Sequence, residues 1–430
     1  MAKPFRIGIA GLGTVGTGVV KILTENSDLV NMRAGREIQI AAVSARSKDK
    51  DRGIDLSAYD WVDNPEDISS YDHLDAVIEL IGGSEGVAAD IVRTSLDNKR
   101  HVVTANKALV ALHGYELAQK AESNDVSLMY EAAVAGGIPI IKSMREGLAA
   151  NNINAVYGIL NGTCNYILTI MRETGRDFAD VLQEAQDHGY AEADPTFDIE
   201  GIDAAHKLCI LTSIAFGVKP DFEALQIRGI TQINATDIAY ATEFGYRIKL
   251  LGIARKVDGE IMQVLEPCLV PIQSPMGIVD DVYNAVYAEG DFVETPLLTG
   301  KGAGEGPTAS SVVSDIIDLA RGFKVPTFGI PVGDLKDADW IDLGDTTARY
   351  YLRLAVLDQP GVIADIASIL KDQNISIEGM VQRGRDPGQS VPIVLTLHEA
   401  RHENMTNAVS QIESLSACKE KPCLMRIEEI

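Results

Sequence analysis

A glycine-rich turn near the start of the chain constrains the fold more than any other feature of the sequence. The apolar segment at residues 5–10 reads FRIGIA, and the turn GLGTVG follows it directly. In a dinucleotide-binding βαβ unit, the first glycine of this pattern makes the turn, the second lets a pyrophosphate approach, and the third lets helix and strand pack closely. The N–H groups that open the following helix can bind the phosphates. The pattern therefore predicts a Rossmann-like nucleotide site formed by Gly11, Leu12, Gly13, Thr14, Val15 and Gly16.

Up to residue 135, short apolar segments alternate with helical ones, which is typical of a parallel α/β sheet. We expect helices that include 16–25 and 108–123, and strands at residues 5–10, 37–44, 74–81, 101–104 and 126–130. Loops at the carboxyl ends of parallel strands face the ligand. Thr104 and Lys107 lie at the end of the fourth strand, so we expect both beside the cofactor; an ordinary surface lysine is the alternative for Lys107.

The end of the second expected strand bears on the choice of cofactor. A site specific for NAD usually carries Asp or Glu there to bind the adenosine ribose, whereas this chain has Arg46, followed by Lys48. A guanidinium can pair with a 2′-phosphate. The sequence therefore favours NADP over NAD, and the alternative is an arginine that is exposed to solvent in a charged loop.

Composition and charge exclude several other classes of function. The formal net charge of −24 argues against binding to nucleic acid or to an anionic membrane, because both require a basic surface. The five cysteines are irregularly spaced and form no CxxC pair, so they suggest neither a disulfide framework nor a zinc site. The first residues do not resemble a signal peptide, and the longest uncharged stretch, 147–171, is too polar to span a bilayer. We therefore expect a cytoplasmic protein.

The rest of the chain divides into three further parts. Residues 136–304 mix short strands with long helices, which favours an α+β domain with a mixed sheet. A helix that opens at Thr308, within 305–325, is expected to complete the nucleotide-binding domain of residues 1–135. A linker at 326–348 then precedes a tail, 349–430, that reads strand, helix, strand, strand, helix, strand, with a turn at Asp386-Pro387-Gly388.

One expected helix, at residues 202–216, carries a pair of opposite charges. Asp203 and Lys207 are four residues apart, so their side chains meet on one face, which continues through the apolar Leu211 and Ile214. Lys207 is therefore expected to be partly buried and held by Asp203. From the spacing alone, an ordinary ion pair within the helix is the simpler interpretation.

Several longer motifs occur in order between residues 11 and 315. After the glycine turn come TANKAL, YEAAVAGGIPII, GILNGTCNYILT, GYAEADPTFDIEGIDAAHKL and KGAGEGPTASSVVSD. Together they resemble homoserine dehydrogenase of the bacterial type. The tail contains YLRLAVLDQPGVIADIASIL and ISIEGMVQ, and it is similar to an ACT domain, a βαββαβ module that commonly binds amino acids. The combination resembles the monofunctional enzyme, which would interconvert L-aspartate 4-semialdehyde and L-homoserine with NADP as the favoured cofactor and NAD as the alternative.

The resemblance implies roles for individual residues. Hydride transfer to an aldehyde puts negative charge on the carbonyl oxygen, which requires a proton donor or a cation nearby. By resemblance Lys207 is that donor with Asp203 beside it, Lys107 joins the catalytic group, and Glu192 binds the substrate α-amino group. The remaining implied contacts are Tyr190, Asp198 and Thr163 for the substrate and Gly304 for the cofactor. A solvated acidic loop is the alternative for the residues around Glu192.

The resemblance also implies a metal ion and an effector. A structural sodium ion would take oxygen ligands from a glycine-rich turn, which the spacing alone does not predict: Glu131, Val134, Gly136 and Ile138. In the tail, residues 358–362 precede a helix whose N–H groups could bind a carboxylate, and by resemblance threonine inhibits there. Because ACT domains commonly pair, we expect a homo-oligomer, either a dimer or a tetramer.

Two rival functions remain open from the sequence. Cys164 could be the nucleophile of a phosphate-dependent aspartate-semialdehyde dehydrogenase, because a cysteine near a helix start can be activated. The Lys207–Asp203 pair suits reversible alcohol–aldehyde chemistry without a covalent step, so a packed small residue is the preferred interpretation of Cys164. The second rival is a non-catalytic amino-acid sensor, which the intact ion pair and glycine turn disfavour.

Overall fold

The computed structural model describes residues 3–383 and 389–430, in two compact units. The first unit comprises Met1–Gly162, Asp203–Leu225 and Val282–Ala338, and the second comprises Thr163–Ile202, Gln226–Asp281 and Asp339–Ile430. The turn expected at Asp386-Pro387-Gly388 lies outside the described residues. No helix in the described part of the chain is both long and apolar enough to cross a bilayer.

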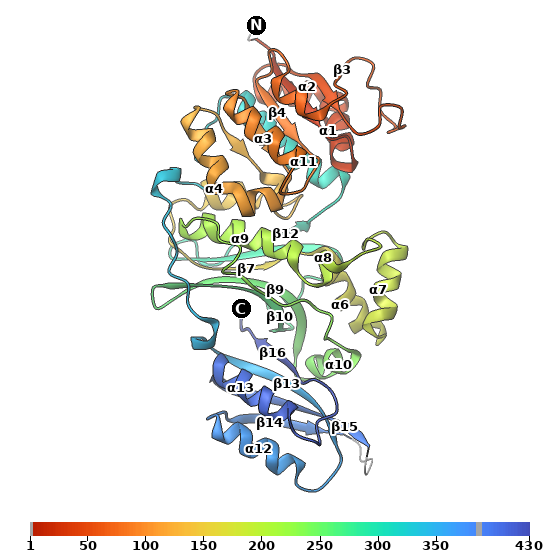
Figure 1. The fold of residues 1–430 in the computed structure, drawn as a ribbon, viewed down its shortest axis with the longest axis vertical. Coiled ribbons are helices and arrows are strands. Elements are labelled where there is room, and N and C mark those ends of the chain that lie inside the picture. The colour runs from red at the N-terminus through yellow and green to blue at the C-terminus, as the bar shows by residue number, and fades with distance from the viewer. Residues whose placement is uncertain (1–2, 384–388) are drawn as a thin grey trace. The chain divides into compact units, whose positions relative to one another are not determined.

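The first unit contains the predicted parallel sheet (Figure 1). Its six strands lie in the order β3-β2-β1-β4-β5-β6, and each neighbouring pair is parallel. The strands are β1 (Phe5–Ala10), β2 (Ile38–Ser44), β3 (Asp60–Trp61), β4 (Ala76–Glu79), β5 (His101–Thr104) and β6 (Leu128–Met129). All five predicted strands are present. The sequence did not predict β3, because two residues are too few to show a pattern.

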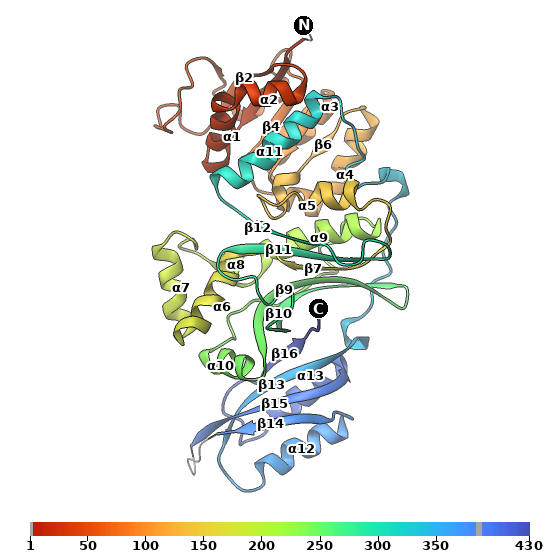
Figure 2. The same cartoon turned by 180° about the vertical axis from the view of Figure 1, so that it is seen from behind.

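Helices cover both faces of this sheet, as Figures 1 and 2 show from opposite sides. One face is covered by α1 (Thr14–Glu25), α2 (Ser27–Ala34) and α11 (Glu305–Ala320), whose apolar side chains share a core with β1. The other face is covered by α3 (Val87–Asp97) and α4 (Lys107–Ser123). The helix α11, from a distant part of the sequence, thus completes the nucleotide-binding fold.

The structure begins α11 at the first residue of the expected segment 305–325, three residues before Thr308, where the apolar pattern opens. The helix begins at Glu305, and Gly304 caps it with a φ of 118°, a conformation that favours glycine. Glu305 is favourable in the first turn because the helix N-terminus is positive, and Pro307 is tolerated there because its missing N–H has no helical partner. The sequence pattern indicated the apolar face of the helix correctly but not its cap.

A small antiparallel sheet also belongs to the first unit. It contains β7 (Ile153–Ile159), β11 (Tyr283–Gly290) and β12 (Leu297–Lys301), with β11 in the middle. The long helix α9 (Ile202–Phe216) follows its predicted bounds. The shorter elements are η1 (Pro65–Ser70), η2 (Glu131–Ala133), α5 (Ile140–Lys142), the π-helical turn η3 (Ser143–Gly147) and η4 (Val332–Asp334).

The second unit is built on a mixed sheet with the order β9-β10-β16-β13-β15-β14. The long hairpin β9 (Tyr246–Val257) and β10 (Glu260–Pro271) is antiparallel, and β10 pairs in parallel with β8 (Gln226–Ile227) and with β16 (Cys423–Ile427). The helices that precede the hairpin are α6 (Gly162–Thr174), α7 (Phe178–Asp187), α8 (Thr196–Ile199) and α10 (Ala235–Glu243). This mixed topology confirms the predicted α+β class.

The tail of the chain folds as the predicted βαββαβ module. It runs through β13 (Thr347–Leu357), α12 (Val362–Asp372), β14 (Ile377–Gln382), β15 (Ser390–Arg401), α13 (His402–Glu413) and β16, after the short η5 (Leu343–Asp345). Both helices pack on one face of the sheet (Figure 2). The last strand, β16, lies between β10 and β13, so the module continues the sheet of the hairpin.

Buried ion pairs reinforce this continuous sheet. Arg426 in β16 donates to Glu266 in β10 at 3.0 Å, and neither side chain is more than 5% exposed. Arg353 in β13 donates to Asp237 in α10 at 2.7 Å, where the aspartate is fully buried. Because an unpaired buried charge costs several kcal/mol, these pairs specify how the tail module joins the hairpin.

The third glycine of the turn provides a direct test of the nucleotide fold. A Cβ atom on Gly16 would lie 2.0 Å from the carbonyl oxygen of Gly11, whereas a Cβ on Gly306 in α11 would meet nothing within 4 Å. We expect Gly16→Ala to lower the free energy of unfolding by about 1–3 kcal/mol. The matched Gly306→Ala should raise it by up to about 1 kcal/mol. Urea denaturation measures both, and equal effects would contradict this account of the turn.

Candidate active site

The glycine turn opens onto a cavity of about 620 Å³ in the first unit. Gly11 has a φ of 106°, and a Cβ at this position would lie 2.6 Å from the backbone of Leu80, so the turn requires glycine here. A Cβ on Gly13 would meet nothing within 4 Å. Its open face therefore leaves room for a pyrophosphate beside the first turn of α1, where Thr14, Val15 and Gly16 lie.

One wall of the cavity is basic, as expected for a phosphate-binding site. Arg46 lines it, together with Lys50 and Arg52, which are not among the predicted site residues. Arg52 Nε donates to the carbonyl of Leu12 at 3.1 Å, and its Nη2 donates to the carbonyl of Ser47 at 2.6 Å. Arg52 thus fastens the loop that carries Arg46 to the glycine turn. The sequence does contain a signal for this basic wall, because every second residue from 46 to 52 is basic.

A buried glutamate organises the loops after β4 and β5. Glu79 is fully buried, and one of its oxygens accepts from the N–H groups of Ile81 and Gly82 at 2.7 and 2.9 Å. The other oxygen accepts from the hydroxyl of Thr104 at 2.6 Å. The predicted cofactor residue Thr104 therefore lies at the strand end but is held by Glu79. The sequence could have indicated this role of Glu79, because a single acidic residue within an apolar strand must find hydrogen-bond partners when it is buried.

The cap of α4 positions Lys107. Asn106 accepts from the N–H of Leu109 at 3.1 Å and donates to the carbonyl of Gly83 at 2.6 Å, which fixes the start of the helix. Lys107, the first residue of α4, places its Nζ 3.1 Å from Oδ1 of Asp203. Lys107 is thus part of an ion cluster rather than an ordinary surface lysine.

Asp203 is the centre of this cluster. Its Oδ2 accepts from Lys207 Nζ at 2.7 Å, across one turn of α9, and from the amide of Asn161 at 2.9 Å. Lys207 Nζ also donates to the carbonyl of Leu160 at 2.7 Å. Lys207 is 8% exposed and Asp203 is 6% exposed, so the pair is more buried than an ordinary surface ion pair.

The charges of the cluster keep its carboxylate ionised. Burial by itself would raise the pKa of Asp203, but the ammonium groups of Lys207 and Lys107 and the hydrogen bonds from Lys207 and Asn161 outweigh it. The pKa of Asp203 therefore lies well below its usual value. An ionised Asp203 keeps an ammonium at position 207 in a fixed orientation.

Lys207 has a hydrogen available for chemistry. An ammonium carries three N–H donors, and within residues 3–383 and 389–430 Lys207 Nζ bonds two acceptors, Leu160 and Asp203. A third donor near a carbonyl oxygen can stabilise the negative charge that hydride transfer develops, and it can supply the proton.

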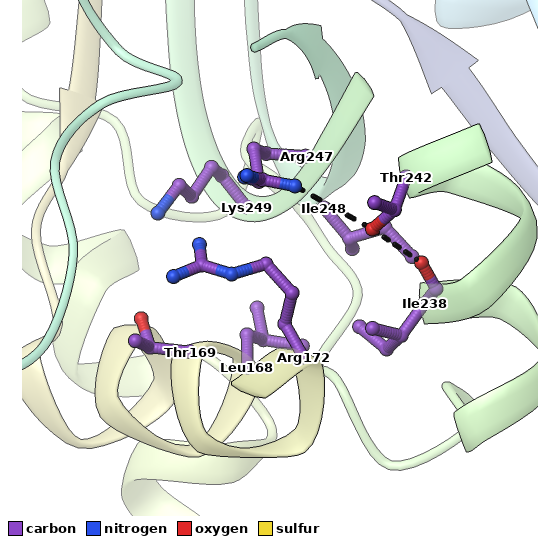
Figure 3. Close-up of a pocket in the computed structure, with 8 residues that line it drawn as sticks. All are labelled: Leu168, Thr169, Arg172, Ile238, Thr242, Arg247, Ile248 and Lys249. Atoms are coloured by element: carbon purple, nitrogen blue, oxygen red, sulfur yellow. Dashed lines mark hydrogen bonds between the residues drawn. The ribbon is translucent and has the colours of Figure 1, made fainter. Parts of the chain in front are cut away.

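A second buried lysine, in the second unit, serves as a contrast. Figure 3 shows Lys249 of β9 and Arg172 of α6 pointing toward each other, with Arg247 beside them. Burial lowers the pKa of Lys249 to about 8, although the nearby Asp280 opposes this shift. The cavity among these side chains is about 10 Å³, which is room for a single water molecule.

All three donors of Lys249 have protein acceptors. Its Nζ donates to Oδ1 of Asn165 at 3.0 Å, to Asp280 at 3.1 Å and to the carbonyl of Val279. Asn165 in turn donates to the carbonyls of Val279 and Asp281 at 3.1 and 2.9 Å. Lys249 therefore anchors the first turn of α6, and it has no donor left for a substrate.

Two of the predicted substrate residues, Tyr190 and Asp198, contact that first turn of α6 through their backbone carbonyls. Thr163 donates from its hydroxyl to the carbonyl of Tyr190 at 2.8 Å, and Cys164 donates to the carbonyl of Asp198 at 3.2 Å. The carbonyl of Glu192, two residues after Tyr190, accepts from Gln186 at 3.1 Å. The four substrate candidates, which are Thr163, Tyr190, Glu192 and Asp198, belong to the second unit, whereas Lys207 and Asp203 belong to the first. That both groups of residues bind the same substrate molecule therefore stays a prediction.

The predicted metal-binding segment forms a buried turn in the first unit. The Glu131 carboxylate accepts from the N–H groups of Ile141 and Lys142, both at 2.9 Å, and the Gly136 carbonyl accepts from Ser311 at 2.6 Å. Burial, reinforced by Asp315, raises the pKa of Glu131 to about 7. Among the described residues, no group of three or more His, Cys, Asp or Glu side chains could hold a metal ion. A cation here would depend largely on carbonyl oxygens.

Comparison with known proteins identifies the family. Residues 11–131 match the family model for the NAD-binding domain of homoserine dehydrogenase, and residues 139–317 match the model for homoserine dehydrogenase itself. The homoserine dehydrogenases of Neisseria gonorrhoeae and Pseudomonas aeruginosa are 44% and 43% identical to this chain, and both matches extend over 100% of this chain. The chain covers 99% and 100% of these two relatives. The chain belongs to the homoserine dehydrogenase family.

Solved structures agree with this assignment. A homoserine dehydrogenase from Thiobacillus denitrificans superposes with a TM-score of 0.93 at 45% identity, over 99% of both chains. A hyperthermophilic archaeal homoserine dehydrogenase in complex with NADPH superposes with a TM-score of 0.63 at 28% identity, over 75% of this chain and 99% of that one. Residues 350–417 match the ACT domain, which confirms the prediction for the tail.

Membership of the family settles the reaction. A homoserine dehydrogenase is an NAD(P)-dependent oxidoreductase of amino-acid biosynthesis, and its substrates are L-homoserine and L-aspartate 4-semialdehyde. The rival interpretations, a semialdehyde dehydrogenase that uses Cys164 and a non-catalytic sensor, are therefore set aside. Cys164 is fully buried, as expected of a packed small residue.

The cluster around Asp203 predicts a pH-dependent stability. Asp203→Asn leaves two ammonium groups without their carboxylate, so we expect the free energy of unfolding at pH 7 to fall by about 3–5 kcal/mol. Because the folded-state pKa is lowered, this contribution is complete above the unfolded pKa of about 4 and is lost as the pH falls through the folded value. The difference between wild type and variant, measured by urea denaturation, should therefore shrink in acid.

A surface pair supplies the matched control. Asp97 contacts Lys120 at 2.9 Å, and their side chains are 53% and 31% exposed. Asp97→Asn should change the free energy of unfolding by less than about 1 kcal/mol at any pH. An Asp203→Asn effect no larger than this control would contradict a buried, ionised Asp203.

Proposed function

We propose that Lys207 is the proton donor when this enzyme reduces L-aspartate 4-semialdehyde. The observation that supports this role is the buried Lys207–Asp203 contact of 2.7 Å, which leaves one donor of the ammonium for the substrate. NADPH, when bound, supplies the hydride. Lys207 then transfers a proton to the oxygen that has become negatively charged, and it regains one from solvent. Asp203 orients the ammonium throughout, and Lys107, on the other oxygen of Asp203, adds positive charge.

We infer that the second unit supplies the contacts to the amino-acid part of the substrate. Glu192 pairs with the α-ammonium group in this proposal, and Tyr190, Asp198 and Thr163 line the same pocket. The hydrogen bond from Thr163 to the Tyr190 carbonyl supports a shared pocket, because it joins the start of α6 to the loop that carries Glu192.

We infer that the enzyme prefers NADP to NAD. Arg46 lines the nucleotide cavity, and Lys50 and Arg52 increase its positive charge. A guanidinium pairs well with the 2′-phosphate that distinguishes NADP. The archaeal relative was solved with NADPH, which agrees with this preference. In the same proposal Gly304, at the start of α11, and Thr104, at the end of β5, face the bound cofactor.

A structural sodium ion is proposed for the turn after Glu131. The residues fit such an ion in one respect: Glu131 and Asp315 are both buried, and Lys142 is 3.1 Å from Asp315. The ammonium group of Lys142 offsets the negative charge of Asp315, and a monovalent cation would balance the negative charge of Glu131. The Glu131 oxygens and the carbonyls of Val134, Gly136 and Ile138 would hold it.

Three further features complete the proposal. We propose that the ACT domain binds an amino-acid effector, for which threonine is the candidate. The enzyme would form homo-oligomers, dimers or tetramers, because isologous pairing is common among such domains. It would act in the cytoplasm, without nucleic acid or membrane partners, as its acidic composition suggests.

Replacement of Lys207 tests the proposed catalyst. Lys207→Ala removes the proton donor, so we expect kcat with NADPH and L-aspartate 4-semialdehyde to fall by about 10²–10⁴-fold. NADPH binding, followed by fluorescence, should be retained because Lys207 does not line the nucleotide cavity. Lys120→Ala, at an exposed pair, is the control and should keep wild-type turnover. The wild-type protein should turn over this substrate under the same conditions, and near-normal turnover of Lys207→Ala would refute the assigned donor.

Replacement of Arg46 tests the choice of cofactor. Arg46→Ala removes a charge-assisted contact to the 2′-phosphate, so we expect KM for NADPH to rise about tenfold or more. KM for NADH should stay the same, because NADH has no such phosphate. Arg33→Ala, an exposed arginine of α2 that does not line the cavity, should change neither value. An equal loss with both cofactors would contradict 2′-phosphate recognition by Arg46.

A further inference from the structure

The ammonium group of Lys249 in β9 is buried where an apolar side chain would be expected. Its side chain is 2% exposed, and the cavity beside it, about 10 Å³, is too small for a substrate. Replacing a buried charge by an apolar residue of similar volume is often neutral for stability or favourable. The stability of the sheet therefore does not explain why a lysine occupies this position, whereas an ammonium can specify the geometry of its acceptors.

The three acceptors of Lys249 come from α6 and from the turn that precedes β11. Nζ donates to Oδ1 of Asn165 in α6 at 3.0 Å, and to Asp280 at 3.1 Å and the carbonyl of Val279 in the turn. Arg172, further along α6, donates to both carboxylate oxygens of Asp280 at 2.6 and 2.9 Å. Lys249 and Arg172 thus both hold this turn against α6 (Figure 3).

The turn has a backbone conformation that depends on such support. Asp281 has a φ of 61°, in the left-handed region that is uncommon for residues other than glycine. Its N–H donates to the hydroxyl of Thr169 at 3.1 Å, and its carbonyl accepts from the amide of Asn165 at 2.9 Å. Asn165, which Lys249 holds by the other amide atom, therefore fixes this turn and the first turn of α6 together.

The same first turn of α6 carries contacts to two of the proposed substrate residues. Thr163 donates to the carbonyl of Tyr190 at 2.8 Å, and Cys164, next to Asn165, donates to the carbonyl of Asp198 at 3.2 Å. A shift of the first turn would therefore change both contacts at once. Small displacements of residues that hold a substrate can have large effects on its binding and reaction.

We propose that Lys249 is a positioning residue for the substrate. Its ammonium group fixes the first turn of α6 through Asn165, and the first turn in its turn fixes Thr163 and Tyr190. Lys249 itself does not contact the substrate. This inference rests on the proposed function, which assigns Thr163 and Tyr190 to the substrate pocket.

The charges around Lys249 give this role a pH dependence. Arg172 of α6, Arg247 of β9 and Asp280 of the turn face its ammonium group, and the side chains that α10 contributes to the cavity are uncharged. Burial lowers the pKa of Lys249 to about 8; Asp280 raises it, and the two arginines lower it. As the pH rises through this value, Lys249 loses its charge and one donor, so it holds α6 and the turn less firmly.

Replacement of Lys249 by methionine tests the proposal. Lys249→Met keeps a side chain of similar length and removes the ammonium, so we expect KM for L-aspartate 4-semialdehyde at pH 7 to rise about tenfold. KM for NADPH should stay within about twofold, because Lys249 does not line the nucleotide cavity. kcat should also be retained, as expected when only substrate binding is weakened. A merely structural lysine would lower the amount of active enzyme, and thus the apparent kcat, without changing KM.

Arg247→Met is the matched control for this substitution. It removes a cation two residues earlier on the same strand, where the guanidinium hydrogen-bonds to Thr242 of α10 at 3.5 Å. We expect its substrate KM to stay within about twofold of the wild-type value. If Lys249→Met does not fold, Asp280→Asn decides the matter: its side chain is 39% exposed, and the loss of its charge should raise the substrate KM about threefold or more.

The pH profile tests the ammonium itself. The ratio of the substrate KM of Lys249→Met to that of the wild type should fall between about pH 7 and pH 9, because lysine loses its proton there and methionine does not titrate. The proposal is overturned if Lys249→Met and Asp280→Asn keep the wild-type substrate KM, if Arg247→Met raises it equally, or if this ratio does not change with pH.

Thr163→Val separates this inference from the proposed function. If Thr163→Val raises the substrate KM and Lys249→Met does not, the positioning role of Lys249 fails and the substrate pocket stands. If Thr163→Val keeps a normal substrate KM, the result counts against the substrate contact assigned to Thr163.

Discussion

The structure of the first unit depends on one carboxylate that is shared by two ammonium groups. Asp203 accepts from Lys207 on one oxygen and contacts Lys107 with the other. Removing a carboxylate from water is costly, and here the neighbouring charges and the amide of Asn161 offset that cost. The result is an ammonium whose orientation is fixed before any substrate arrives. Such preorganised charge is the main source of catalytic power in many enzymes.

Each partner of Asp203 is placed by a different part of the fold. Lys107 opens α4, whose cap Asn106 is held by the loop after β4, and that loop is held by the buried Glu79. Leu160 and Asn161 follow β7, so the antiparallel sheet sets their position. The nucleotide turn and the ion cluster around Asp203 are therefore connected through the carboxyl ends of β4 and β5. This is where ligands bind in open parallel sheets.

Local patterns in the sequence predicted the parts of the site that lie close together in the chain. The glycine turn and the pairing of Asp203 with Lys207 depend on spacings of a few residues, which a strand or helix converts directly into geometry. The partnership of Lys107 with Asp203 could not be predicted in this way, because it joins two helices that are distant in sequence. The insertion of β16 between β10 and β13 is likewise a non-local pairing. The cap of α11 at Gly304 was missed because the apolar pattern begins only at Thr308.

The most direct test of the account is a crystal structure of the enzyme with NADP and L-homoserine. We expect Lys207 Nζ to lie within about 2.6–3.2 Å of the hydroxyl oxygen of homoserine, the reach of proton transfer, while Asp203 keeps its contact with the same nitrogen. That carbon–oxygen group should also face the nicotinamide ring. An Nζ atom turned toward bulk water, with another acid or base on the hydroxyl, would contradict the account.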